Sequence, residues 1–369
     1  MAVKGQGSSE TYTNYTRALE LCQLTGDTSE LFEALSGLWV FHLLRAELRE
    51  ANALAEQLLA STRESKDDSR IAYANFAAGD TAFWCGQLDT AAERLALAVA
   101  ACKPGKRPSR VFVDDPAMIS RAYAAWTQQY RGYPDQALTT VRDCIRVAHT
   151  LSHPRALAMA TIYAGQLYLL RREPDAAVEC CRTSTSLAGE HGLPFYQVFA
   201  EILAGCAAVQ HGDGARGVEA IKRGICTWQS LGSTLGVPWF LGELAEGLRS
   251  IGRCDEALNV VSDALHRTEG SGEREFAAEL YRIAGTAMMT QGKSVEAENS
   301  FRRAIEIART QGARMWDLRA TTSLAPLLAK QGRRAEARTM LAEIYGWFTE
   351  GFDTADLKDA KALLDELGA

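Results

Sequence analysis

Small and large apolar residues recur along the chain at a fixed spacing, and this spacing predicts a helical repeat. A glycine, Gly292, ends one apolar stretch, and Ala297 lies inside the next. The same pattern returns in steps of 40 residues, with one longer step of 46. The turn positions are Ala46, Gly86, Gly132, Arg172, Gly212, Gly252, Gly292 and Gly332. Self-similarity at such a period indicates a solenoid of stacked units.

Each unit reads as two helices joined by a short turn. The residue seven positions before the turn is small in seven units of eight: Trp39, Gly79, Ala125, Gly165, Gly205, Ala245, Gly285 and Ala325. The residue nine positions after the turn is mostly large and apolar: Ala55, Leu95, Val141, Cys181, Ile221, Val261, Phe301 and Leu341. Small residues let two helices approach closely, and large ones fill the space between them.

The two ends of the chain fall outside the repeat. Residues 1–9 have no apolar stretch, so we expect a flexible lead-in, and residues 10–25 read as the second helix of an incomplete unit. The solenoid is therefore expected to span residues 10–352. Residues 353–369 predict a capping helix with leucines on one side and charges on the other, which is how a repeat array closes its core.

The longer step contains an insertion at residues 103–116. Three prolines and a glycine in this segment exclude a continuous helix. A long loop inside a compact array is often functional, and a tolerated surface insertion is an equal alternative. Because the insertion lies between the units of Trp84 and Trp126, we expect it to fold against the inner face near these two residues.

Composition excludes several classes of protein. The formal net charge of -6 argues against a nucleic-acid binder, which would carry a basic surplus. No run of 18 apolar residues is present, so no membrane-spanning helix is expected. The nine cysteines form neither a disulfide framework nor a zinc pattern, which favours a reducing, cytoplasmic location.

Two segments resemble nucleotide-binding motifs but lack the structural context that those motifs require. The segment Gly212-Asp-Gly-Ala-Arg-Gly217 matches the dinucleotide fingerprint, but a helix precedes it where a strand is required. Gly292-Lys-Ser resembles the end of a phosphate loop, again between two helices. The six histidines form no metal-binding pair. We expect no catalytic residue, no metal and no cofactor; an enzyme of unrecognised type is the minor alternative.

The positions of small and large residues resemble those of the tetratricopeptide repeat over roughly residues 29–348. The chain departs from that family in its period, which is 40 residues against the usual length of about 34. HEAT and armadillo repeats also run near 40 residues, but the small–large–small positions favour the tetratricopeptide type. The resemblance implies an all-α, right-handed superhelical solenoid of about eight antiparallel helix pairs with a C-terminal capping helix.

The C-terminal segment Tyr345-Gly-Trp-Phe-Thr-Glu-Gly-Phe-Asp resembles the end of large bacterial regulatory proteins with MalT-like tetratricopeptide arrays. Ala278-Glu-Leu-Tyr-Arg, Gly132-Tyr-Pro-Asp-Gln-Ala-Leu and Leu151-Ser-His-Pro match the same arrays. Those proteins carry a class III nucleotide cyclase or DNA-binding domain, then a STAND-type ATPase, then the array. The cyclase and ATPase parts are absent from this sequence, so the resemblance implies a non-catalytic regulatory region.

By the same resemblance, the first helix of each pair lines the inner face of the superhelix. In the N-terminal half the candidate binding residues are Tyr73, Phe76, Asp80, Phe83, Trp84, Trp126, Gln129, Tyr130, Gln166 and Phe199. In the C-terminal half the candidates are polar: Arg249, Arg282 and Arg319. Apolar walls with sparse polar anchors suit a ligand pocket, and the alternative is that these residues only pack against one another.

Asp80 is the most informative candidate, because it is a lone carboxylate among aromatic residues. A buried unpaired charge is costly, so it should meet a partner residue, a basic ligand or solvent. We expect a cytoplasmic sensing module that binds a protein, a peptide or a small ligand and acts on an effector domain in the same polypeptide. It would contact neither nucleic acid nor a membrane. A free-standing adaptor that grips an extended peptide is the alternative.

Overall fold

The computed structural model describes residues 9–25, 28–102 and 115–368. Within these ranges the chain forms eighteen helices and no strand, which confirms the predicted all-α fold. The helices are α1 (Ser9–Thr25), α2 (Thr28–Leu44), α3 (Leu48–Ser61), α4 (Asp68–Trp84), α5 (Leu88–Ala101), α6 (Pro116–Arg131), α7 (Pro134–Leu151), α8 (Pro154–Leu170), α9 (Pro174–His191), α10 (Pro194–Gln210), α11 (Gly214–Ser230), α12 (Val237–Ser250), α13 (Cys254–Ser271), α14 (Ala277–Thr290), α15 (Ser294–Gln311), α16 (Arg314–Lys330), α17 (Arg334–Tyr345) and α18 (Ala355–Gly368).

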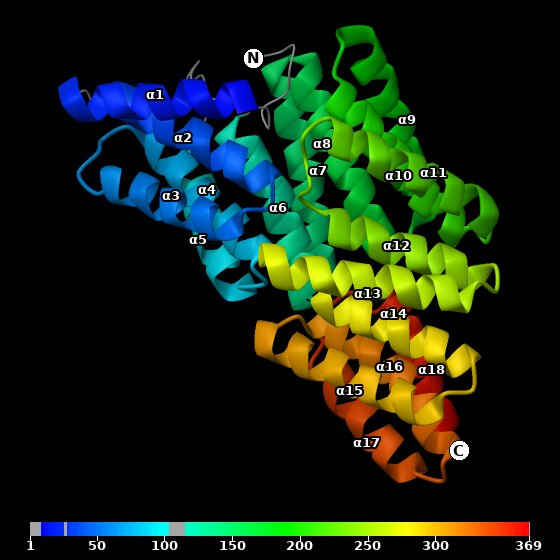
Figure 1. Cartoon of the computed structure of the whole chain (residues 1–369). Coiled ribbons are helices and arrows are strands. Elements are labelled where there is room, and N and C mark those ends of the chain that lie inside the picture. The colour runs from blue at the N-terminus through cyan, green and yellow to red at the C-terminus, as the bar shows by residue number, and fades with distance from the viewer. Residues whose placement is uncertain (1–8, 26–27, 103–114, 369) are drawn as a thin grey trace.

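Helices α2 to α17 form eight antiparallel pairs that wind into a right-handed superhelix, as predicted (Figure 1). The first helix of one pair packs against the first helix of the next, for example α4 against α6 and α6 against α8. The even-numbered helices therefore lie on the inside of the curve. Helix α1 packs on α2, and α18 packs on α16 and α17 at the other end. No described helix is both long and apolar enough to cross a membrane.

The turn inside each pair requires a left-handed backbone, and this requirement explains the recurring glycines. All eight predicted turn residues have positive φ, from 55° at Ala46 to 92° at Gly132. Arg172 adopts φ 61° although a Cβ makes this region unfavourable by about 1–2 kcal/mol. A second series of positive φ values, which the sequence reasoning missed, marks the turns between pairs: Ser152, Gly192, Gly232, Gly272 and Gly312.

Close approach within a pair depends on the predicted small–large contacts. A Cβ added to Gly285 would lie 2.6 Å from the ring of Phe301, the large residue sixteen positions later. A Cβ on Gly205 would lie 2.9 Å from the side chain of Ile221 in the same arrangement. These glycines are thus required by the distance between the two helices of a pair.

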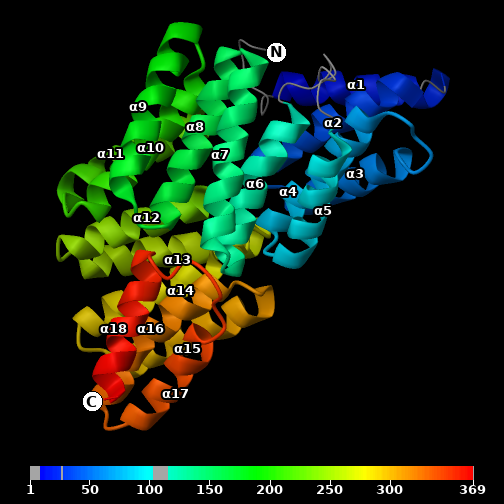
Figure 2. The ribbon, with the colours of Figure 1, turned by 180° about the vertical axis from the view of Figure 1, so that it is seen from behind.

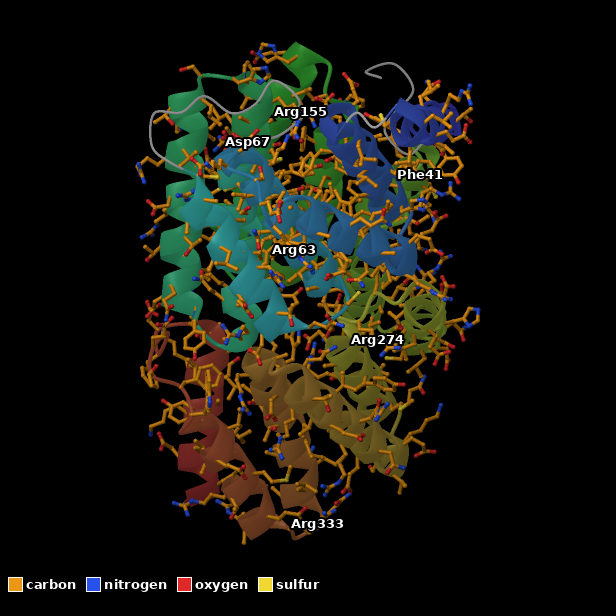
Figure 3. All side chains as sticks on the ribbon, turned by 90° about the vertical axis from the view of Figure 1, so that its left-hand side faces the viewer. Phe41, Arg63, Asp67, Arg155, Arg274 and Arg333 are labelled. Carbon is orange, nitrogen blue, oxygen red and sulfur yellow. The ribbon has the colours of Figure 1, made fainter. Side chains whose placement is uncertain are left out.

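Successive turns of the superhelix touch along a line of contacts that we call the seam. It joins the C-terminal ends of α2, α4, α6 and α8 to residues 231–237, 272–276, 311–319 and 347–359. The backbone oxygen of Leu44 accepts a hydrogen bond from the N–H of Thr234 at 2.8 Å, and that of Trp84 accepts one from Arg274 at 2.7 Å. In Figure 1 the pairs coloured yellow to red lie beneath those coloured cyan to green. Arg274, labelled in Figure 3, is exposed at the seam.

The seam continues to the C-terminus, and three of its contacts join residues at a nearly constant separation along the chain. Glu350 accepts hydrogen bonds from the N–H groups of Asp135 and Gln136 at 2.9 and 3.1 Å, and Figure 2 shows the corresponding segment beneath the N-terminal start of α7. Arg172 donates to Asp356, which lies 184 residues later. Trp84 and Arg274 are 190 residues apart. These two separations differ by six residues because the 46-residue step lies between Trp84 and Arg274 but not between Arg172 and Asp356.

Several predictions concern segments at the edges of the described residues. The flexible lead-in at residues 1–9 and the insertion at residues 103–116 lie largely outside them, so both stay predictions, as does the placement of the insertion near Trp84 and Trp126. The described part resumes at Asp115, whose carboxylate accepts the N–H of Ala117 at 2.8 Å and caps α6. At the C-terminus, α18 lies where the capping helix is predicted.

Candidate functional site

The residues predicted for the N-terminal half of the inner face are all buried. Their exposed fractions run from 1% for Asp80 to 8% for Tyr73. Five of them come from α4, three from α6, and one each from α8 and α10: Tyr73, Phe76, Asp80, Phe83 and Trp84; Trp126, Gln129 and Tyr130; Gln166; and Phe199. The fold thus brings them onto neighbouring inner helices, but it covers them.

Part of the cover comes from the second turn of the superhelix. The ring of Tyr130 lies 5.3 Å from that of Phe83 and 4.6 Å from that of Trp316 on α16, measured between centroids. Trp126 donates its indole N–H to the backbone oxygen of Tyr163 on α8 at 3.0 Å. Among the described residues these candidates therefore line no open groove, and a ligand could reach them only if their neighbours moved.

Asp80 is almost fully buried, which makes the ionised form of its carboxyl unfavourable. Burial raises the pKa of its carboxyl well above the usual value, and the nearby polar groups of Trp84 and Tyr123 act in the opposite direction. Its Oδ1 atom accepts no hydrogen bond. The sequence reasoning considered only the charged form of Asp80, whereas a neutral carboxyl needs no basic partner.

The inner face of the second turn holds what we call the interior ion-pair network, formed by Glu246, Glu279, Asp356, Arg249, Arg282 and Arg319. Arg282 on α14 contacts Glu246 at 2.7 Å and Glu279 at 2.9 Å. Arg319 on α16 contacts Asp356 on α18 at 2.8 Å and Glu279 at 3.4 Å. The network therefore ties four helices together across three repeats.

All three arginines predicted for this half lie in the network. Arg249 contacts Glu246 at 2.7 Å. Arg319 also donates to the backbone oxygen of Leu170, at the end of α8, at 2.5 Å, and its guanidinium lies 4.9 Å from the ring centroid of Trp316. Arg319 thus spans the seam, and its charge is neutralised by residues of the chain itself.

Glu243 on α12 is a carboxyl that the sequence reasoning missed. It makes no ion pair or hydrogen bond with any described residue. Burial and the nearby charges of Glu246 and Glu279 raise its pKa to about 8, against the opposite effect of Arg319 and Arg282. Glu243 lies nine residues before its turn, the position that Tyr123 and Tyr163 occupy in two earlier units. Comparing this position across the repeats would have identified it.

Several other polar atoms on the inner helices are buried without a partner. Gln129 on α6 is 1% exposed, and neither its amide nitrogen nor its oxygen has a hydrogen-bond partner. Gln166 on α8 is 5% exposed, and its Oε1 has none. Each buried group left unsatisfied costs about 1–3 kcal/mol, so such groups in a native structure require an explanation.

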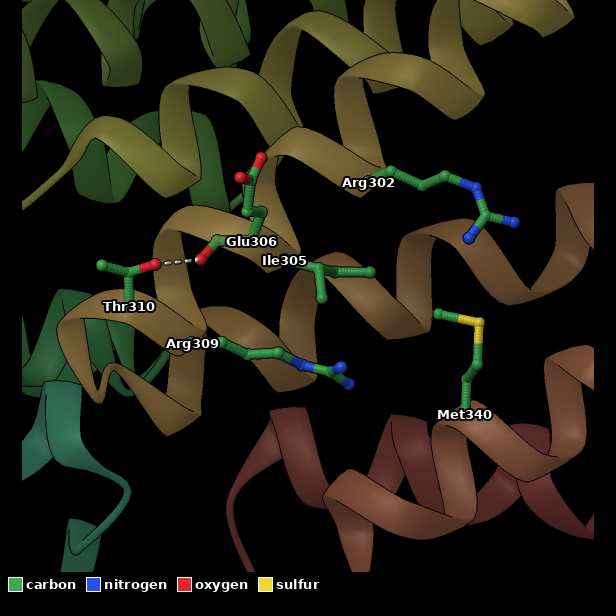
Figure 4. Close-up of a pocket in the computed structure, with 6 residues that line it drawn as sticks. All are labelled: Arg302, Ile305, Glu306, Arg309, Thr310 and Met340. Atoms are coloured by element: carbon green, nitrogen blue, oxygen red, sulfur yellow. Dashed lines mark hydrogen bonds between the residues drawn. The ribbon is translucent and has the colours of Figure 1, made fainter.

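A shallow pocket of about 400 Å³ lies on the outer surface between α15 and α17 (Figure 4). Its lining residues are Arg302, Ile305, Glu306, Arg309, Thr310 and Met340. The arginines already have partners: Arg302 contacts Glu336 at 2.8 Å, and Arg309 contacts Asp317 at 3.0 Å. The pocket therefore offers no free charge to a ligand. Within the described residues, no group of three or more metal-ligating side chains is placed to hold a metal.

No model of a known protein family matches this sequence. Among curated proteins, the chain is similar to an uncharacterised protein of Rhizobium meliloti (strain 1021). The two are 26% identical over 189 residues, which cover 51% of this chain and 18% of the other protein. The chain therefore matches less than a fifth of the length of that relative.

Three solved structures share the architecture. A Rap protein complexed with competence and sporulation factor has a TM-score of 0.56 and 11% identity, covering 92% of this chain and 98% of that one. The apo form of RapI has a TM-score of 0.52 and 12% identity over 76% of this chain and 98% of its own. NprR in complex with its cognate peptide NprX has a TM-score of 0.51 and 12% identity over 90% and 81%. At these identities the likeness concerns the fold, and the chain is a tetratricopeptide-like helical-repeat solenoid.

Proposed function

We propose that this chain is a non-catalytic regulatory module that binds a peptide, or an extended segment of a partner protein, inside its superhelix. The observation that carries the proposal is the set of unpartnered polar atoms on the inner helices, foremost the amide of Gln129 and Oε1 of Gln166. An extended peptide offers N–H and C=O groups at regular intervals. A peptide bound along these helices would supply the missing hydrogen bonds.

The comparisons support this proposal at the level of the fold. Two of the similar structures contain a bound factor or peptide, namely the Rap protein with competence and sporulation factor and NprR with NprX. A superhelix of this architecture can therefore hold a small peptide. The residues that would do so in this chain are the buried candidates on α4, α6, α8 and α10.

Entry of a peptide would require the seam to open. The seam uses a few backbone hydrogen bonds, such as those of Leu44 and Trp84, together with the side-chain contacts of Tyr130 and Arg319. Separating the turns leaves the contacts within each helix pair intact, so opening is less costly than unfolding. A ligand that binds only the open form shifts the population toward it, and its apparent affinity is reduced by the cost of opening.

We further propose that an effector domain in a longer bacterial signalling protein of the cytoplasm responds to this movement. The chain matches only 18% of its Rhizobium meliloti relative, which leaves ample length for such a domain in that protein. A change in the angle between the two turns would be transmitted through α18, because Arg172 and Arg319 both contact Asp356 in that helix.

The test uses affinity selection from a random pool of linear hexapeptides on the immobilised chain, followed by calorimetry with the selected peptides. Replacing Gln129 with leucine removes an unsatisfied amide, so Gln129→Leu should raise the free energy of unfolding by about 1–3 kcal/mol. The same change should weaken peptide binding roughly tenfold, because the amide no longer meets the peptide backbone. Gln57→Leu, on the exposed side of α3, is the matched control. Absence of any selected peptide, or equal binding by both variants, would reject the proposal.

A further inference from the structure

We infer that Glu243 is an anchor for a cationic group, a primary ammonium or a guanidinium, of the ligand that enters the superhelix. The inference rests on the proposed function and adds to it the chemical class of the ligand. It concerns a residue outside the predicted inner-face candidates, and it follows from how the interior charges are matched.

Every carboxylate of the interior ion-pair network has an arginine beside it. Glu246 and Glu279 share Arg282, at 2.7 and 2.9 Å, and Asp356 has Arg319 at 2.8 Å. Glu243 has no such partner among the described residues, although it lies one helical turn from Glu246. Its side chain is only partly buried, so a small group can reach it. Glu243 thus lies beside the network without an arginine of its own.

Among the described residues, a second buried carboxyl without an ion pair lies on the segment that contacts Trp316. Glu275 is 2% exposed, and its Oε2 has no hydrogen-bond partner. The backbone oxygen of Glu275 accepts the indole N–H of Trp316 at 3.2 Å, and Trp316 packs on Tyr130. Burial raises the pKa of Tyr130; the carboxyls of Glu275 and Glu243 raise it further, and the Arg319 guanidinium lowers it. Glu275 and Glu243 thus both act on Tyr130, and neither makes an ion pair with a described residue.

Carboxylate oxygens and aromatic faces are the two groups that recognise ammonium and guanidinium ions in proteins. The chain itself already uses this combination, since Arg319 lies over Trp316 while it contacts Asp356. A ligand cation at Glu243 would make the same kind of carboxylate contact on another inner helix. An anionic ligand would gain no such contact and would disfavour ionisation of Glu243, so the site favours a basic peptide over an acidic one.

Binding should also release a proton. Several groups act on Glu243 or are acted on by it: Glu246, Glu279, Arg282, Arg319, Tyr130 and Cys206. With a pKa of about 8, Glu243 is mostly protonated at pH 7 in the empty chain. A cation beside it favours the ionised form, so the proton leaves when the ligand arrives. An uncharged ligand at the same place would leave the proton where it is.

The experiment compares two pools of linear hexapeptides with acetylated N-termini and amidated C-termini. One pool contains arginine and lysine; the other has citrulline and norleucine in their place. Peptides selected on the immobilised chain are measured by calorimetry at pH 7 in two buffers of different ionisation enthalpy. We expect the cationic peptides to bind at least tenfold more tightly than their neutral analogues and to release close to one proton per complex.

Glu243→Gln should abolish both the preference for cationic peptides and the proton release. Glu269→Gln, which neutralises an exposed carboxyl on α13, should change neither. Because glutamine resembles the protonated carboxyl, Glu243→Gln should melt at the wild-type temperature at pH 6, which separates lost binding from lost folding. Equal binding of both pools, or an unchanged preference in Glu243→Gln, would overturn the anchor and leave the proposed function standing. Failure to select any peptide from either pool would overturn both.

Discussion

Arg172 donates a hydrogen bond to Asp356 at 3.3 Å across 184 residues of chain, from a backbone position where six of the seven equivalent residues are glycine. The same guanidinium contacts Asp359 at 2.6 Å. A non-glycine residue with positive φ is unfavourable, so the side chain provides a compensating link between the first turn of the superhelix and α18. This relationship leads to a direct test of the seam.

Replacing Arg172 with glycine should leave global stability nearly unchanged while loosening α18. Relief of the left-handed backbone is worth about 1–2 kcal/mol. Two losses oppose this gain: the greater entropy of an unfolded glycine, about 0.5–1 kcal/mol, and two partly exposed ion pairs, each about 0–1 kcal/mol. Hydrogen exchange should be faster in α18 and unchanged in α8. Ala46→Gly, which relieves a similar backbone without removing a contact of this kind, should stabilise the chain and leave α18 protected. Unaltered exchange in α18 of Arg172→Gly would contradict a structural link at this point.

Gly285→Leu should destabilise one part of the solenoid more than the rest. A side chain at this position meets the ring of Phe301, and overpacking of this kind costs about 1–3 kcal/mol or more. Each pair contacts mainly its neighbours, so hydrogen exchange should increase chiefly between residues 250 and 340. The control is Gly270→Leu, at a helical glycine where an added Cβ would meet no atom within 4 Å, so no such loss is expected. Uniform loss of protection along the whole chain would be inconsistent with a modular array.

Trp126→Ala should lower stability strongly, whether or not Trp126 contacts a ligand. The indole is buried between α4 and α8, and truncating a buried tryptophan costs about 3–5 kcal/mol. It would also leave the backbone oxygen of Tyr163 without its donor. Denaturant unfolding measures the loss, with Phe352→Ala as the control, because that ring is exposed and should matter by less than about 1 kcal/mol. A loss below about 1 kcal/mol for Trp126→Ala would mean that the closed interior is not the stable state in solution.

Stability should fall as the pH rises from about 4.5 to about 8. The pKa of Glu243 is about 8 in the folded chain against the ordinary value of 4.5 for a glutamate, because burial disfavours its ionised form. The folded state therefore binds more protons than the unfolded state in this interval, and stability decreases with pH until the group is ionised in both. Thermal melts between pH 5 and 9 should show a shallower decline in Glu243→Gln. An identical slope in wild type and variant would show that Glu243 ionises freely in the folded chain.

Most of the architecture could be predicted from the sequence because it depends on local requirements. A left-handed turn selects glycine, and close helix approach selects small residues, so both leave a mark every 40 residues. The spacing was strong enough to include Ala46 and Arg172, which lack the glycine. The second series of turns, from Ser152 to Gly312, followed the same rule and could have been found in the same way.

The closed interior could not be predicted in this way. Whether two turns of a superhelix touch depends on the small rotation between successive pairs, which accumulates over several repeats and has no local signature. The contact of Tyr130 with Trp316 is a product of that accumulation. The sequence therefore identified the inner face but left open whether its aromatic residues bind a ligand or pack. Glu243 was missed because tyrosines occupy its position in two other units.

Three seam contacts, Leu44 with Thr234, Trp84 with Arg274 and Arg172 with Asp356, join residues 190 or 184 positions apart, which restricts how this protein can change its length. An open solenoid can gain or lose a repeat, because each unit contacts only its neighbours. Here, if one 40-residue pair between Trp84 and Arg274 were removed, Trp84 would lie opposite a different repeat from the one that carries Arg274. Every later seam contact would shift in the same way. Extra residues between two pairs, as in the 46-residue step, leave the order of facing repeats unchanged. Evolution and engineering can thus lengthen connections that make no seam contact, while the number of repeats is fixed by the closure of the superhelix.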